Sequence, residues 1–115
     1  MYKSYVVFFQ CPRHRAGRFE IEEGVYAYVG SCGRSCIKRV TRHLTRPARK
    51  RWHVDFLQCT PLYAVVTPLP EAEFARRLSS AYPYVAGFGS TDDRESPSHL
   101  FRCGAEALLH AGFTI

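Results

Sequence analysis

Two tyrosines beside a glycine-bearing turn are the first residues in this sequence suited to chemistry. The run GVYAYV, residues 24–29, alternates as a β-strand, so Tyr26, Tyr28 and Gly30 share one face. Most strand tyrosines pack in a core. Here, however, the turn after Gly30 leads to a helix N-terminus, where unpaired N–H groups and the helix dipole favour an anion. The tyrosine face therefore borders a candidate anion site.

The sequence from Ser35 to Pro47 predicts the helix that follows this turn, because apolar residues recur at three- and four-residue intervals. Ser35 is suited to the N-cap. Arg39 and His43 are neighbours one turn apart, beside the apolar face. A polar group there can be held rigidly at the edge of a cleft, although surface side chains whose stems cover the core show the same spacing.

The excess of positive charge is concentrated in one segment. The chain has 16 Lys and Arg against 10 Asp and Glu, for a net charge of +6, and no acidic residue lies between Glu23 and Asp55. A solubility surface usually mixes both signs, whereas a field of one sign attracts polyanions. We therefore predict phosphate or DNA contacts from the basic residues of this segment other than Arg39: Arg34, Lys38, Arg42, Arg46, Arg49, Lys50 and Arg51.

The remaining pattern predicts one α/β domain over residues 1–115. We expect a small three-stranded, largely antiparallel sheet flanked by helices, with strands at 5–9, 24–29 and 62–67. The uninterrupted apolar run YVVFF suggests that the first strand is central. Further helices are expected from Pro70, at the first-turn position, through Glu71 to about Tyr82, and from Gly104 to about Leu109. Residues 52–57 stay unassigned, 87–98 form a loop, and 99–103 are a short segment.

The five cysteines and the N-terminus bear on the compartment. The cysteines are odd in number and include no CxxC pair, so we expect small buried side chains in a reducing cytoplasm rather than disulfides or zinc ligands. Intracellular proteins of hyperthermophiles are an exception in which an internal disulfide is plausible. No apolar stretch is long enough for a membrane span, and the N-terminus does not resemble a signal peptide. The expected location is the cytoplasm, with no membrane partner.

Several segments together resemble a known family. In order, GVYAYVGS, RVTRHL, WHVDFL, EAEFA and GFGST with SHLF are similar to the small Uri-type branch of the GIY-YIG endonucleases. Members of this branch occur alone or fused to a base-excision glycosylase. The resemblance covers nearly the whole chain and implies a GIY-YIG-like fold.

This resemblance implies hydrolysis of DNA phosphodiester bonds with a divalent ion, Mg²⁺ or Mn²⁺. Tyr28 matches the tyrosine of the second signature, Arg39 the helix arginine that holds the scissile phosphate, and Glu71 the metal-binding glutamate. The resemblance also places Tyr5 at the first signature and His43 one turn after the arginine. His53 and His99 complete the candidate DNA contacts, and Asp92 and Ser98 also match. Trp52 is expected mainly in the core.

Two departures from the family pattern leave a second function open. The first signature lacks its glycine, and the loop before SHLF has Asp93 and Glu95 where the branch often has a cysteine pair. The alternative is a non-catalytic nucleic-acid-binding module or an accessory subunit of a DNA repair glycosylase. The metal ligand also has an alternative, Glu73. Glu71 is favoured because it precedes the apolar helix residues by three, four and seven positions and therefore points along their stripe.

Overall fold

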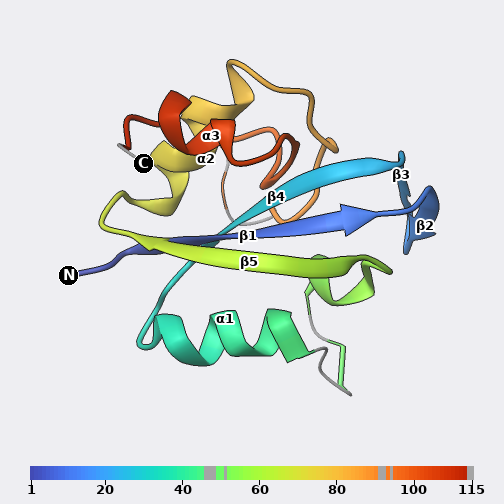
Figure 1. Ribbon diagram of the computed structural model, residues 1–115, viewed down its shortest axis with the longest axis horizontal. Helices are drawn as coiled ribbons and strands as arrows, with labels where there is room; N and C mark the ends of the chain where they lie inside the picture. Colours follow the sequence, from blue (N-terminus) through green and yellow to red (C-terminus); the bar gives the residue numbers. More distant parts are fainter. Residues whose placement is uncertain (46–48, 51, 91–92, 94, 114–115) are drawn as a thin grey trace.

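The computed structural model describes residues 1–45, 49–50, 52–90, 93 and 95–113. Two layers of helices enclose a twisted sheet (Figure 1). The elements in chain order are β1 (Ser4–Cys11), β2 (His14–Ala16), β3 (Phe19–Ile21), β4 (Gly24–Ser31), α1 (Cys36–Thr45), a 3₁₀ helix η1 (His53–Phe56), β5 (Thr60–Thr67), α2 (Glu71–Ser79), β6 (Leu100–Arg102) and α3 (Glu106–His110).

The main sheet has the strand order β5-β1-β4-β6, and all of its neighbouring strands are antiparallel. β1 therefore lies inside the sheet, and Val6, Val7 and Phe8 are fully buried. The central position predicted from the YVVFF run is confirmed. In the register of β1 with β4, Tyr5 lies opposite Gly30 and Val7 opposite Tyr28. This pairing brings the two predicted signature tyrosines onto neighbouring strands.

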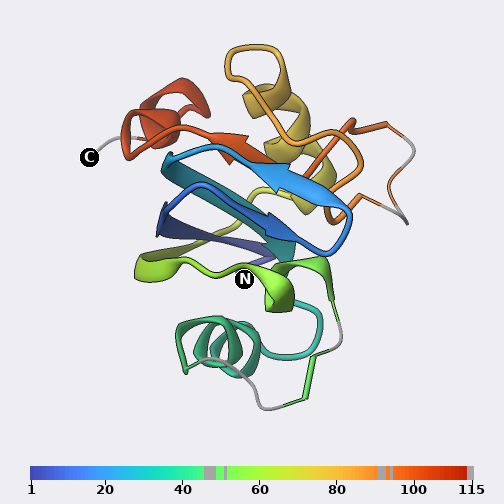
Figure 2. The same cartoon turned by 90° about the vertical axis from the view of Figure 1, so that its right-hand side faces the viewer.

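Strand alternation divides the core into two clusters, one on each face of the sheet. Tyr5 and Tyr28 belong to the cluster that includes Val40 of α1, whereas Ala27 and Val29 pack with Phe74 of α2. Figure 2 shows the resulting arrangement, with α1 below the sheet and with α2 and α3 above it. The predicted division of the β4 side chains between the two faces is confirmed.

The prediction of three strands was wrong, because the sheet has four. Residues 99–103, which the sequence placed in a short segment, contain β6, and this strand pairs with Tyr26, Ala27 and Tyr28 of β4. A strand of three residues is too short to show a clear alternation pattern. The link between β1 and β4 also forms a separate hairpin, β2 with β3. The unassigned segment 52–57 contains the 3₁₀ helix η1.

The three α-helices begin close to their predicted positions. Ser35 caps α1 as expected, since its Oγ accepts a hydrogen bond of 3.2 Å from the N–H of Lys38. α2 starts at Glu71, with Pro70 at the N-cap one position earlier than predicted, and it ends at Ser79 rather than near Tyr82. The hydroxyl of Ser79 donates to the carbonyl of Arg76, which competes with continued helical bonding. No helix in the described part of the chain combines the length and apolar character needed to cross a membrane.

The prediction of unpaired cysteines was wrong for four of the five. Cys11 is bonded to Cys59 and Cys32 to Cys36, and Cys103 is a buried free thiol. The first pair is 48 residues apart in sequence, but the antiparallel pairing of Gln10 with Thr60 brings the two cysteines together. Spacing along the chain does not reveal such a pair, because the sheet register creates it. The second pair spans the turn between β4 and α1.

Candidate active site

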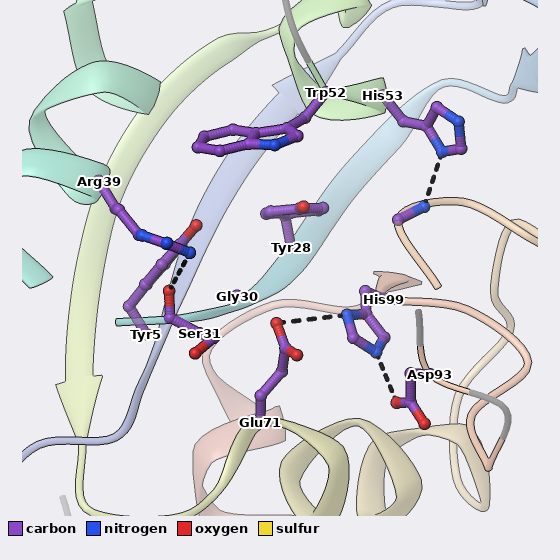
Figure 3. Close-up of a pocket in the computed structure, with 11 residues that line it drawn as sticks. Tyr5, Tyr28, Gly30, Ser31, Arg39, Trp52, His53, Glu71, Asp93 and His99 are labelled. Atoms are coloured by element: carbon purple, nitrogen blue, oxygen red, sulfur yellow. Dashed lines mark hydrogen bonds and ion pairs between the residues drawn. The ribbon is translucent and has the colours of Figure 1, made fainter. Parts of the chain in front are cut away.

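A pocket of about 490 Å³ lies at the edge of β4 beyond its pairing with β6. Tyr5 and Tyr28 enter it from the sheet, Arg39 from α1, and Glu71 from the start of α2 on the other face (Figure 3). The two helix layers meet at this edge, because β6 covers β4 only from Tyr26 to Tyr28. Four of the five predicted catalytic residues thus line one cavity.

The spacing of the two tyrosines depends on Gly30. Gly30 lies opposite Tyr5 in the register, and a Cβ atom at this position would overlap the phenol ring of Tyr5. Burial raises the pKa of Tyr5 well above its ordinary value, and the nearby Tyr28 adds to this effect. Burial, followed by the charge of Glu71, also raises the pKa of Tyr28. Both hydroxyls are therefore protonated at neutral pH.

The fifth predicted residue, His43, lies behind Tyr5 rather than in the pocket wall. Its Nε2 is 2.6 Å from the Tyr5 hydroxyl, and the residue is 5% exposed. Burial lowers the pKa of His43 to about 4, with Arg42 and Arg39 acting in the same direction against Asp55. The imidazole is therefore neutral at neutral pH, and its Nε2 shares one hydrogen bond with the Tyr5 hydroxyl. The Nδ1 atom of His43 has no hydrogen-bond partner among the described residues.

Arg39 is fixed at the opening of the pocket by the turn that precedes its helix. Its Nη1 donates a 3.0 Å hydrogen bond to the carbonyl oxygen of Ser31, and its guanidinium lies 5.7 Å from the centroid of the Trp52 ring. Gly33 adopts φ 55° within the turn, and a Cβ atom there would meet the Arg39 guanidinium. The guanidinium is therefore held in place while it lines the pocket.

The two candidate glutamates occupy different surroundings. Glu71 lines the pocket with its side chain 30% exposed, whereas Glu73 forms an ion pair of 2.9 Å with Arg77 on the same helix. Burial raises the pKa of Glu71, although His99, the Ser31 N–H and Arg39 act in the opposite direction. The inward direction predicted for Glu71 from helical periodicity is confirmed.

His99 connects Glu71 to a second carboxylate. Its Nδ1 is 3.6 Å from Oε2 of Glu71, and its Nε2 is 2.8 Å from Oδ2 of Asp93. Burial alone would raise the pKa of Asp93, but the nearby Ser96 hydroxyl together with the hydrogen bonds of Asp93 to His99 and to the Glu95 N–H outweighs it and holds the pKa below its usual value. Asp93 lines the pocket and was not among the predicted site residues. The signal in the sequence for a role of Asp93 at the site was its position six residues before His99.

The predicted DNA contacts that the structure describes fall into three groups. Arg34, Lys38, Arg49 and Lys50 are exposed, whereas Arg42 is bound to Asp55 at 2.6 Å. His53 and His99 line the pocket, and Nδ1 of His53 accepts a 2.9 Å hydrogen bond from the Gly89 N–H. Burial lowers the pKa of His53, as does Arg18. Arg46 and Arg51, together with the matching Asp92, lie outside the described residues.

The pocket offers a cation two carboxylates, those of Glu71 and Asp93, and Asp93 is already bound to His99 at 2.8 Å. No group of three or more His, Cys, Asp or Glu side chains in the described ranges could hold a metal ion by itself. A Mg²⁺ ion nevertheless needs few protein ligands, because waters and phosphate oxygens complete its octahedral shell. Glu71, which burial partly deprives of water, fits such an ion when a phosphate is bound alongside.

A comparison with protein-family models matches residues 4–113 to one family, described as "Domain of unknown function DUF123". The chain belongs to the DUF123 family. The match includes every pocket residue named above, from Tyr5 in β1 to His99 beside β6. Comparisons with curated proteins and with solved structures give no significant match. The DUF123 match therefore places the entire site within one family domain.

Proposed function

We propose that this DUF123 chain is a metal-dependent DNA endonuclease of the GIY-YIG type. One observation carries the proposal: Tyr5, Tyr28, Arg39 and Glu71, which come from four separate elements, line a single cavity. This set supplies hydroxyl groups for a water, a guanidinium for a phosphate and a carboxylate for a cation. Metal-dependent phosphodiester hydrolysis uses these three functions.

Tyr5 is suited to position the attacking water. In the His43 tautomer that leaves Nε2 unprotonated, Tyr5 would donate its proton to Nε2 and keep a lone pair that can accept a hydrogen bond from a water in the pocket. The raised pKa values of both phenols keep them protonated, and Tyr28 can donate to the water or to a phosphate oxygen. We therefore assign the water to Tyr5, whose proton has an acceptor in that tautomer.

Arg39 is suited to hold the phosphate that is cleaved. Its contact with Ser31 uses Nη1 and leaves other N–H donors of the planar guanidinium for phosphate oxygens. Such a group stabilises negative charge where it develops in the transition state. Its attachment to the turn after β4 means that it needs no rearrangement when a phosphate arrives.

Glu71 would hold the divalent ion, Mg²⁺ or Mn²⁺, and His99 and Asp93 would orient this carboxylate. A bound ion would stabilise charge on the leaving oxygen. The contacts of His99 with both acids support this role, because side chains that anchor a ligating carboxylate fix its direction. Glu73 is already paired with Arg77, which supports Glu71 as the ligand.

The exposed basic residues are suited to bind the DNA backbone on either side of the cut. Arg34 lies in the turn before α1, Lys38 precedes Arg39 on that helix, and Arg49 and Lys50 precede η1. Lysine and arginine contacts to phosphates supply affinity without sequence preference. The expected substrate is therefore defined by DNA structure rather than by base sequence.

A cleavage screen tests the proposal. Nicked, branched, flapped and fully paired duplexes should be incubated with the protein in Mg²⁺, in Mn²⁺ and in EDTA. We expect cleavage of at least one structure in a divalent ion and none in EDTA. If the protein binds DNA but cleaves none of the substrates, the alternative function is favoured, a non-catalytic module that serves a repair glycosylase.

A further inference from the structure

Trp52, the single tryptophan of the chain, lines the pocket although its sequence context suggested a core residue. In the view of Figure 3, the indole lies above Tyr28 and across the pocket from Glu71. It is partly buried and packs against the core cluster beneath it. A large aromatic surface therefore forms part of the wall of a site that also carries charged and hydroxyl groups.

The indole is held in place by the residues beside it. The backbone N–H of Trp52 donates a 2.9 Å hydrogen bond to Oδ2 of Asp55, and Arg42 contacts the same oxygen at 2.6 Å. The Asp55 side chain is 1% exposed, so this junction is shielded from water. The backbone of Trp52 is thus anchored between α1 and η1 before any ligand binds, and its ring packs against the core cluster. A ring packed in this way loses little conformational freedom on binding.

Two guanidinium groups lie against the indole. The Cζ atom of Arg42 is 5.0 Å from the ring centroid, and that of Arg39 is 5.7 Å away. Both distances fall within the range of a cation–π contact. Because Arg39 is also the proposed phosphate ligand, a nucleotide whose phosphate binds Arg39 would have its base, or the adjacent base, within reach of the Trp52 ring.

We propose that Trp52 is a stacking surface for a nucleobase next to the scissile phosphate, and that the site therefore takes DNA with an unpaired nucleotide at the cut. This inference rests on the proposed function and narrows its substrate class. Bases in an intact duplex stack on one another and do not offer their faces to a protein side chain. Flaps, single-stranded tails and frayed junctions do offer them, and stacking on an aromatic ring tolerates every base.

The single tryptophan makes the inference measurable by fluorescence. Wild-type protein in EDTA, where cleavage is not expected, should be titrated with a short single-stranded oligonucleotide, a duplex with a single-stranded tail and a blunt duplex. Stacking of a base on the indole quenches its emission. We expect saturable quenching by the first two ligands and none by the blunt duplex, and an abasic site at the junction nucleotide should remove it.

Substitutions separate stacking from folding. Trp52→Leu should weaken single-strand binding by roughly 5- to 150-fold, the range for loss of one base–aromatic stack. Trp52→Phe keeps an aromatic ring and should lose less. Tyr63→Leu is the matched control, because Tyr63 is 42% exposed but packs on Phe8 at the opposite face of the sheet. It should bind as wild type, and circular dichroism of each variant checks the fold.

The outcomes also separate this inference from the proposed nuclease activity. Equal quenching by blunt and single-stranded DNA, binding of single strands without quenching, or wild-type affinity of Trp52→Leu each overturns the stacking surface. Efficient cleavage of blunt duplex together with any of these results would leave the nuclease proposal standing. A protein that binds none of these DNA ligands would overturn both the stacking surface and the nuclease proposal.

Discussion

The Tyr5 hydroxyl lies 2.6 Å from Nε2 of His43, and this hydrogen-bonded pair joins the first strand of the sheet to the helix that carries Arg39. The imidazole is neutral at neutral pH, because burial lowers its pKa to about 4. The contact with Tyr5 is therefore made by an uncharged, buried ring.

We predict that His43 makes the fold less stable in acid. Its pKa is about 4 in the folded protein and near 6.5 when unfolded, so below pH 6.5 the unfolded state binds a proton that the folded state does not. The free energy of unfolding should thus fall by about 3 kcal/mol as the pH drops from 6.5 to about 4. Urea denaturation across this range should show a shallower dependence for His43→Gln than for wild type. Parallel curves would show that His43 is not the titrating group.

Arg39→Lys should lower cleavage by roughly 100- to 1000-fold, the range for removal of one oriented donor from developing charge. The charge survives in this variant, but lysine lacks the planar pair of donors that matches a phosphate. Single-turnover rates on the best substrate from the screen provide the measurement. Arg34→Lys is the control, because Arg34 is exposed in the turn and should keep most of its activity. Comparable rates for the two variants would reduce Arg39 to an ordinary backbone contact.

DNA affinity should fall as salt rises, since bound lysine and arginine release counterions from the phosphates. Removing Arg34 and Lys38 together should reduce the slope of log K against log salt by about two units on duplex DNA. The control is Arg76→Ala, an exposed basic position on α2 outside the basic segment, which should leave the slope unchanged. Salt-independent binding by wild type would exclude an electrostatic interface of this kind.

The disulfides predict a thiol count and a stability difference. Oxidised protein denatured without reductant should expose one thiol, that of Cys103, and reduction should expose all five. Replacing Cys11 and Cys59 by alanine should cost about 4 kcal/mol of unfolding free energy, and replacing Cys32 and Cys36 about 2 kcal/mol, because the first bond closes the longer loop. Five reactive thiols in the unreduced protein would contradict the pairing.

Local periodicity was enough to predict the parts of the site that lie on one element. Strand alternation placed Tyr28 and Gly30 on one face, and helical spacing turned Glu71, rather than Glu73, toward the interior. The N-cap at Ser35 followed from the same local rules. These features depend on neighbours in sequence, which the sequence displays directly.

Features that depend on pairing between distant segments could not be predicted in this way. Cys11 meets Cys59 only because β1 and β5 are antiparallel in one register. His99 approaches Glu71 only because it lies beside β4, where its carbonyl oxygen accepts a 2.9 Å hydrogen bond from the Val29 N–H. Helical spacing placed His43 one turn after Arg39. Its buried contact with Tyr5, however, forms only because α1 packs on the sheet.

The carboxylate of Glu71 provides the most direct test of the proposed function. Glu71→Gln keeps the size and polarity of the side chain but removes the charge that a divalent ion requires, and Glu73→Gln is its matched control on the same helix turn. As a mere partner of the helix dipole, Glu71 would contribute well under about 1 kcal/mol to stability and nothing to cleavage. Thermal unfolding of both variants establishes that each is folded.

The deciding measurement is cleavage of the best DNA substrate in Mg²⁺ by wild type, Glu71→Gln and Glu73→Gln, with binding measured in parallel. We predict that Glu71→Gln binds DNA but does not cut it, while Glu73→Gln cuts at a rate close to wild type. A Glu71→Gln protein that cleaves as well as wild type, or an inactive Glu73→Gln protein beside it, would contradict the assignment of Glu71 as the metal ligand.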